Sequence, residues 1–86
     1  MDFIYESERI YALDEGGRLI CEITFPVRGD AAVIDHTFVD PSLRGRKIAD
    51  RLVREAIAEI RARGLVPAAT CPYAVKWFRE HPGDVG

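Results

Sequence analysis

The chain lacks the features of a metalloprotein and of a disulfide-stabilised protein. It has only two cysteines, Cys21 and Cys71, which are far apart and form no CxxC motif. A small chain held together by disulfides normally has more cysteines, so we expect reduced thiols. His36 and His81 are the only histidines, and neither has a partner at zinc-finger spacing. No metal site is therefore predicted.

Long apolar segments are also missing. No apolar run approaches the roughly 18 to 20 residues that a membrane helix needs. Met1 is followed directly by Asp2, without the basic and apolar regions of a signal peptide. These absences predict a cytoplasmic protein with no membrane partner. With 86 residues, of which 48% are apolar and 30% charged, the chain has the composition of a single globular domain over residues 1–86.

The charge is small overall but unevenly distributed. The net charge is -2, which argues against a general nucleic-acid binder. Residues 1–43 contain three basic and nine acidic side chains, whereas residues 44–86 contain nine basic and five acidic ones. The second half of the chain is therefore suited to attract an anion.

Apolar periodicity predicts strands in the first half of the chain. An extended segment runs from Phe3 to Ala12 and ends at a hairpin turn over residues 14–17, and a second strand over residues 18–25 alternates with a period of two. That alternation places Cys21 on the buried face. Residues 26–30 are predicted to form a turn and residues 31–39 a central strand.

The second half of the chain has helical periodicity. Apolar residues recur every three or four positions from Arg46 to Ile60, which predicts an amphipathic helix ending before Gly64. A short strand over residues 65–70 follows. Cys71-Pro72 is typical of a helix start, and this second helix is predicted to end near His81.

This order of elements predicts an α+β fold in which antiparallel strands precede a β-α-β-α unit. The strands on either side of the first helix should be parallel, with a right-handed crossover. The carboxyl ends of parallel strands lie at the same edge of a sheet. The loop over residues 40–47 and the helix start at Cys71 should therefore open onto one crevice, where open α/β sheets bind ligands.

The segment Arg44-Gly45-Arg46-Lys47-Ile48-Ala49 has the strongest chemical pattern in the sequence. It joins a strand to a helix N-terminus, where unpaired N–H groups and the helix dipole favour an anion such as phosphate. Gly45 permits a close approach of the backbone, and three cationic side chains add attraction. The alternative is a basic, solvated helix start. The segment is neither a Walker loop nor a Rossmann fingerprint.

At these residues the sequence resembles the GNAT N-acetyltransferase superfamily, and in particular its small single-domain acetyltransferase-like members. Arg44 and Ala49 match the two ends of the superfamily's phosphate loop, and Lys47 stands at its middle glycine. The similarity covers about residues 31–84. It also includes His36-Thr37, Leu43-Arg44-Gly45, Arg63-Gly64-Leu65, Cys71-Pro72-Tyr73 and His81-Pro82.

The resemblance implies that acetyl-coenzyme A binds between two splayed parallel strands. It implies that the pantetheine arm pairs with the backbone near Phe38 and Val39, and that residues 44–49, including Arg46 and Ile48, hold the pyrophosphate. Larger members of the superfamily have an asparagine where this chain has Cys71. They also have a tyrosine general acid where this chain has Phe78.

Cys71 and His36 are the candidate catalytic residues. A thiol at a helix N-terminus near basic residues should have a lowered pKa, so Cys71 can act as a nucleophile or a proton donor, the alternative being a simple helix cap. Histidine titrates near neutral pH, so His36 is a candidate general base for an amine, the alternative being a packed or surface residue. Trp77 and Phe78 are predicted to be core residues.

Three functions are weighed from the sequence. The first is an acetyl-coenzyme A dependent N-acetyltransferase acting on an unidentified amine, as a monomer or a homodimer. The second is a coenzyme A or acyl-coenzyme A binding module with little turnover, which Phe78, Lys47 and the absence of acceptor-site helices favour. The third is a nucleic-acid or protein interaction domain, which the net charge and the lack of an aromatic and basic platform argue against.

Overall fold

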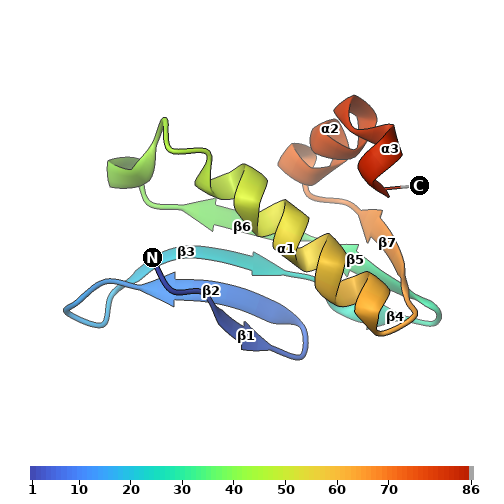
Figure 1. Ribbon diagram of the computed structural model, residues 1–86, viewed down its shortest axis with the longest axis horizontal. Coiled ribbons are helices and arrows are strands. Elements are labelled where there is room, and N and C mark those ends of the chain that lie inside the picture. Colours follow the sequence, from blue (N-terminus) through green and yellow to red (C-terminus); the bar gives the residue numbers. More distant parts are fainter. Residues whose placement is uncertain (86) are drawn as a thin grey trace.

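The computed structural model describes residues 1–85, and its strands precede its helices along the chain except for the last strand (Figure 1). The strands are β1 (Ile4–Glu6), β2 (Arg9–Leu13), β3 (Leu19–Thr24), β4 (Val27–Arg28), β5 (Ala31–Ile34), β6 (His36–Val39) and β7 (Val66–Ala69). The helices are α1 (Ile48–Ala62), α2 (Pro72–Glu80), α3 (Pro82–Val85) and the short 3-10 helix η1 (Pro41–Leu43).

The strands form two sheets, and the chain passes from one to the other between consecutive strands. The first sheet has the order β1-β2-β3-β6 and is antiparallel throughout. The second has the order β4-β5-β7, in which β5 and β7 are parallel and are joined through α1. The predicted α+β fold, with antiparallel strands followed by a β-α-β-α unit, is confirmed.

The central strand predicted over residues 31–39 is not one strand but two. The chain changes sheets at Asp35, so that β5 pairs with β7 whereas β6 pairs with β3. Asp35 donates its N–H to the Thr24 carbonyl, and its carboxylate accepts the Thr24 hydroxyl at 2.5 Å. These local contacts compete with regular pairing, and apolar periodicity does not register them.

Three smaller features also differ from the prediction. The extended segment over residues 3–12 is interrupted by a turn between β1 and β2. The turn predicted over residues 26–30 contains the short strand β4, because Gly29 adopts a φ of +62° and closes a tight hairpin with β5. Helix α3 follows α2 immediately after His81, where the sequence predicted only an ending.

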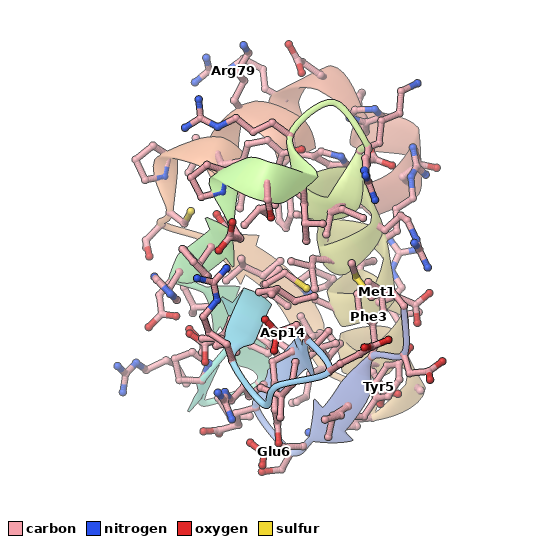
Figure 2. All side chains as sticks on the ribbon, turned by 90° about the vertical axis from the view of Figure 1, so that its left-hand side faces the viewer. Met1, Phe3, Tyr5, Glu6, Asp14 and Arg79 are labelled. Carbon is pink, nitrogen blue, oxygen red and sulfur yellow. The ribbon has the colours of Figure 1, made fainter. Side chains whose placement is uncertain are left out.

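Helix α1 lies across the strands and covers the core (Figure 1). It buries the predicted apolar stripe, which consists of Ile48, Leu52, Val53, Ala56, Ile57 and Ile60, against buried strand residues that include Cys21. Gly64 has a φ of +73° just past the helix end, as predicted. Figure 2 shows Met1 and Phe3 beside α1, and Phe3 packs against the edge of this core.

The polar face of α1 carries two ion pairs between residues four positions apart. Asp50 and Arg54 are 3.0 Å apart, and Glu59 and Arg63 are 3.8 Å apart. Such exposed pairs each contribute only a few tenths of a kcal/mol to helix stability. Among residues 1–85, no helix is both long and apolar enough to cross a bilayer.

Candidate functional site

The site begins where the two parallel strands separate. β5 and β7 pair as far as Ile34 and Ala69. There the Ile34 carbonyl accepts the N–H groups of both Thr70, at 3.0 Å, and Cys71, at 3.2 Å. Beyond this point β6 pairs with β3, while the other chain turns into α2. Of the strands in the described part of the chain, none pairs with the other edge of β6.

Backbone groups of β6 are therefore available at that edge. Phe38 lies opposite Glu22 in register, and the next pair but one, Asp40 and Ile20, is hydrogen-bonded at 2.8 Å. Antiparallel pairing alternates, so the N–H and C=O groups of Thr37 and Val39 point away from β3. An extended ligand lying in the gap between β6 and α2 would meet these groups.

A cavity of about 250 Å³ lies next to this edge, at the start of α1. Its lining is mostly the predicted anion-binding segment, with contributions from β6 and α2: Val39, Leu43, Arg44, Gly45, Lys47, Ile48, Ala49, Asp50 and Tyr73. The structure thus brings the segment and the open end of β6 together. Arg46 lies in the same loop, and Phe38 points to the other face of the sheet.

The backbone of this loop presents unpaired donors to the cavity. The first helical hydrogen bond of α1 runs from the Arg51 N–H to the Lys47 carbonyl at 3.2 Å. Within the described residues no carbonyl or side chain accepts the N–H groups of Gly45, Lys47, Ile48, Ala49 or Asp50. Gly45 has a φ of +80° and Lys47 a φ of +56°, a left-handed value unusual for lysine. The helix therefore begins without a side-chain cap.

The cations of the loop have no partners either. Arg44, Arg46 and Lys47 are exposed, and none forms an ion pair within residues 1–85. By contrast, Asp40 at the start of η1 pairs with Arg18 at 3.0 Å and caps the Ser42 N–H at 2.9 Å. The acidic group of the loop is thus engaged, and its basic groups are free.

Two polar residues of the cavity, Tyr73 and Asp50, were not among the site residues predicted from the sequence. Tyr73 lines the cavity from α2, and its pKa is raised first by burial and then by the charges of Asp50 and Glu80. Its phenol therefore remains a hydrogen-bond donor. Asp50 lines the cavity from α1. The spacing carried a signal for both, because Tyr73 follows the Cys71-Pro72 helix start and Asp50 follows the loop by one turn.

Cys71 occupies the N-cap position of α2, at the point of strand separation, and its side chain makes no capping hydrogen bond. Its Sγ lies 3.4 Å from the Thr37 Oγ1 of β6, and its side chain is 8% exposed. Burial raises the thiol pKa, but the Thr37 hydroxyl and the nearby N–H groups of Ala74, Tyr73 and Thr37 outweigh it, so that the pKa is lowered. The direction of the shift agrees with the expectation from the sequence, but its causes are the Thr37 hydroxyl and backbone N–H groups rather than basic side chains.

His36 lies on the opposite face of β6 from Cys71. Thr37 is paired with the buried Ile23 and contacts Cys71, whereas His36 is paired with Thr24 and is exposed. The His36 Nε2 is 3.2 Å from Glu22 Oε1, and Glu22 Oε2 is 2.5 Å from Arg9 Nε. The two candidate catalytic residues thus flank β6 and do not contact each other.

The aromatic residues of α2 have structural roles. Trp77 is 3% exposed and belongs to the core, against which the half-buried Phe78 packs, as predicted. Both cysteines are free. In the described range, residues 1–85, no three His, Cys, Asp or Glu side chains gather where they could hold a metal ion.

Comparison with known families shows what this arrangement belongs to. A family model described as GCN5-related N-acetyl-transferase matches residues 9–85. The chain belongs to the GCN5-related N-acetyltransferase family. The resemblance drawn from the loop and from Cys71-Pro72-Tyr73 is therefore confirmed. A search of curated proteins finds no match.

Solved structures of acetyltransferases share the fold. A GCN5-like protein from Staphylococcus aureus, solved by NMR, has a TM-score of 0.75 and 25% identity, with 98% of this chain and 85% of that chain covered. Glucosamine-6-phosphate N-acetyltransferase from Arabidopsis thaliana has a TM-score of 0.57 and 17% identity, covering 92% and 61%. The aminoglycoside N-acetyltransferase AAC(6')-Iy, solved with CoA, has a TM-score of 0.56 and 20% identity, covering 93% and 68%.

Proposed function

We propose that this GCN5-related domain transfers an acetyl group from acetyl-coenzyme A to an amine. The unpaired donors at the start of α1 carry the proposal. They lie beside three cations without partners, in a cavity that reaches the open edge of β6. A pyrophosphate matches these N–H groups and charges, and an extended pantetheine arm matches the outward-facing backbone groups of Val39. AAC(6')-Iy, which has the same fold, was solved with CoA.

Different residues are proposed to hold different parts of the cofactor. Gly45, Lys47, Ile48 and Ala49 offer N–H groups to the pyrophosphate, and Arg44 and Arg46 offer charge. The arm follows the β6 edge beside Phe38 and Val39 toward Cys71. The thioester then lies near the point where the strands separate. The acetyl group of the cofactor would then lie at the edge of β6, between the face that contacts Cys71 and the face that carries His36.

Cys71 is proposed as the nucleophile. Its thiolate bonds to the acetyl carbon, the bond from that carbon to the coenzyme A sulfur breaks, and coenzyme A leaves as a thiolate that takes a proton from solvent. The amine then bonds to the acetyl carbon and Cys71 leaves as a thiolate. The donors around Sγ stabilise the thiolate before and after transfer.

His36 is proposed as the base that takes the proton from the amine. It is exposed on the face of β6 that Cys71 does not occupy, and Glu22 Oε1 lies 3.2 Å from its Nε2. An acceptor approaching from that face meets the imidazole before the thioester. Direct transfer, with Cys71 as the proton donor to coenzyme A, uses the same two residues.

The loop is tested by coenzyme A binding. Calorimetry of the double variant Arg44→Ala/Arg46→Ala should show binding about 10- to 100-fold weaker than wild type, because two charge-assisted contacts are lost. The double variant Arg28→Ala/Arg63→Ala removes the same charge at exposed positions outside the cavity and serves as the control. Equal affinity in the loop variant, folded by circular dichroism, would exclude the loop from the site.

Turnover separates the enzyme from a binding module. Acetyl-coenzyme A and a panel of amines should give release of free thiol that depends on the amine. Binding of coenzyme A without turnover on any amine would favour the binding module. Phe78 supports that alternative, because it stands on α2 where the resemblance places a tyrosine general acid in larger members of the superfamily.

A further inference from the structure

Asp50 places a negative charge in the cavity proposed for the pyrophosphate. It is the third residue of α1, lines that cavity, and has a side chain 30% exposed. A carboxylate at this helical position can turn back toward the unpaired N–H groups of the first turn. In that rotamer it would compete with a phosphate for the same donors.

Both oxygens of Asp50 are instead held by groups outside the loop. Oδ1 accepts the indole N–H of Trp77 at 2.8 Å, and Oδ2 accepts the Nε–H of Arg54 at 3.0 Å. The Trp77 hydrogen bond is the largest cause of the lowered pKa of Asp50, and Arg54 lowers it further. The carboxylate is therefore ionised at neutral pH, and each of its oxygens already accepts a hydrogen bond from a side chain outside the loop.

Trp77 is itself fixed in place. Its side chain is 3% exposed, the His81 ring stacks on it at 4.0 Å, and the Arg54 guanidinium lies 5.1 Å from its ring centre. The indole cannot follow Asp50 toward the loop without leaving the core. The hydrogen bond thus fixes the rotamer of Asp50 and not that of Trp77.

We propose that Trp77 and Arg54 are positioning residues that hold the Asp50 carboxylate off the N-terminus of α1 and so keep its N–H groups free for a phosphate ligand. This inference rests on the proposed function of the loop. An anionic side chain inside an anion site is thereby made compatible with binding, because its charge is paired with Arg54 and its oxygens are occupied.

A double-mutant cycle with coenzyme A tests the proposal. Trp77→Phe keeps an aromatic ring but removes the N–H, and should weaken coenzyme A binding about tenfold, the value of one hydrogen bond to a charged group. Asp50→Ala should bind coenzyme A more tightly than wild type. The double variant Asp50→Ala/Trp77→Phe should bind like Asp50→Ala, because no carboxylate remains to be held.

Arg54→Gln supplies a second, exposed probe in case Trp77→Phe does not fold. It should weaken binding more than Arg61→Gln, which removes the same charge further along α1. A double variant as weak as Trp77→Phe alone, or an Arg54→Gln variant no weaker than Arg61→Gln, would overturn the inference while wild-type binding stands. Failure of the wild type to bind coenzyme A would instead overturn the proposed function.

Discussion

Cys21 and Cys71 are both buried, but the regions around them change their thiols in opposite directions. Cys21 lies on β3 in the sheet core with no exposed surface, and burial raises its pKa despite smaller opposing effects of the Ala12 backbone and Arg51. Cys71 is nearly as buried, yet its pKa is lowered by the Thr37 hydroxyl and backbone N–H groups. Burial alone therefore does not decide the chemistry of a thiol in this fold.

The two regions differ in how their backbone donors are used. β3 pairs with β2 on one side and β6 on the other, so its amides are engaged. At Cys71 a strand ends, a helix begins and β6 has turned away, so several N–H groups converge without a regular partner. The same excess of donors occurs at the start of α1. In this molecule the groups proposed to react and to bind coenzyme A lie where regular pairing stops.

The largest expected effect on this contrast is in turnover. Cys71→Ala should lower kcat about 100- to 10,000-fold with coenzyme A affinity unchanged, because the thiol is proposed to act in the reaction rather than in ground-state binding. Cys21→Ala should retain the wild-type kcat and lose about 1 kcal/mol of stability. Steady-state kinetics and calorimetry measure both. A Cys71→Ala enzyme that keeps its rate would reduce Cys71 to a helix cap.

Alkylation compares the two thiols directly. Iodoacetamide should modify Cys71 at least about tenfold faster than Cys21 at pH 7, since a larger fraction is thiolate. The alkylation rate at Cys71 should reach half of its maximum at a pH below the pKa of an ordinary thiol, and the rate at Cys21 at a pH above that pKa. Coenzyme A should protect Cys71 only. Mass spectrometry of each site as a function of pH gives the rates, and equal rates would contradict the contrast.

The Thr37 hydroxyl is expected to account for part of this difference. Thr37→Val keeps the shape of the side chain but removes the group 3.4 Å from Sγ. The pH midpoint for alkylation of Cys71 should rise, and that of Cys21 should stay the same. Rates measured on one sample provide the internal control. An unchanged Cys71 midpoint would assign the lowered pKa to the helix N-terminus alone.

The smallest effect concerns the other face of β6. Glu22→Gln should lower the amine-dependent kcat about two- to tenfold and leave the KM for acetyl-coenzyme A unchanged, because the carboxylate 3.2 Å from His36 Nε2 is lost. Arg9→Gln breaks the other contact of Glu22 and should leave that kcat unchanged. Equal kcat values for Glu22→Gln and wild type would show that Glu22 does not position His36.

Local patterns along the chain predicted most of the fold and indicated where the candidate site lies. The apolar stripe of α1, the alternation in β3, Gly64 and Cys71-Pro72 each depend on neighbouring residues only. The split at Asp35 could not be predicted in this way, since it depends on contacts with Thr24 on another strand. The apolar, β-branched pattern of such a segment does not distinguish one long strand from two short strands in different sheets.

For the candidate site, too, the sequence predicted what depends on local patterns and not what depends on long-range contacts. Residues 44–49 and Cys71 carry local signals of a helix start, and the parallel pairing of β5 and β7 brings them to one edge. Asp50 and Tyr73 enter the cavity through the packing of α2 beside α1, and Glu22 reaches His36 across a strand pair. These long-range contacts have no counterpart in periodicity.

The one-sided pairing of β6 has a consequence for hydrogen exchange. Successive amides of this strand face opposite ways, toward β3 or toward the open edge. A cofactor lying along that edge acts as a missing strand. On binding, the amide proton of Val39 would become slow to exchange, while that of Phe38, already paired with β3, would change little. This difference between two neighbouring amides would record the path of the ligand without any side chain being altered.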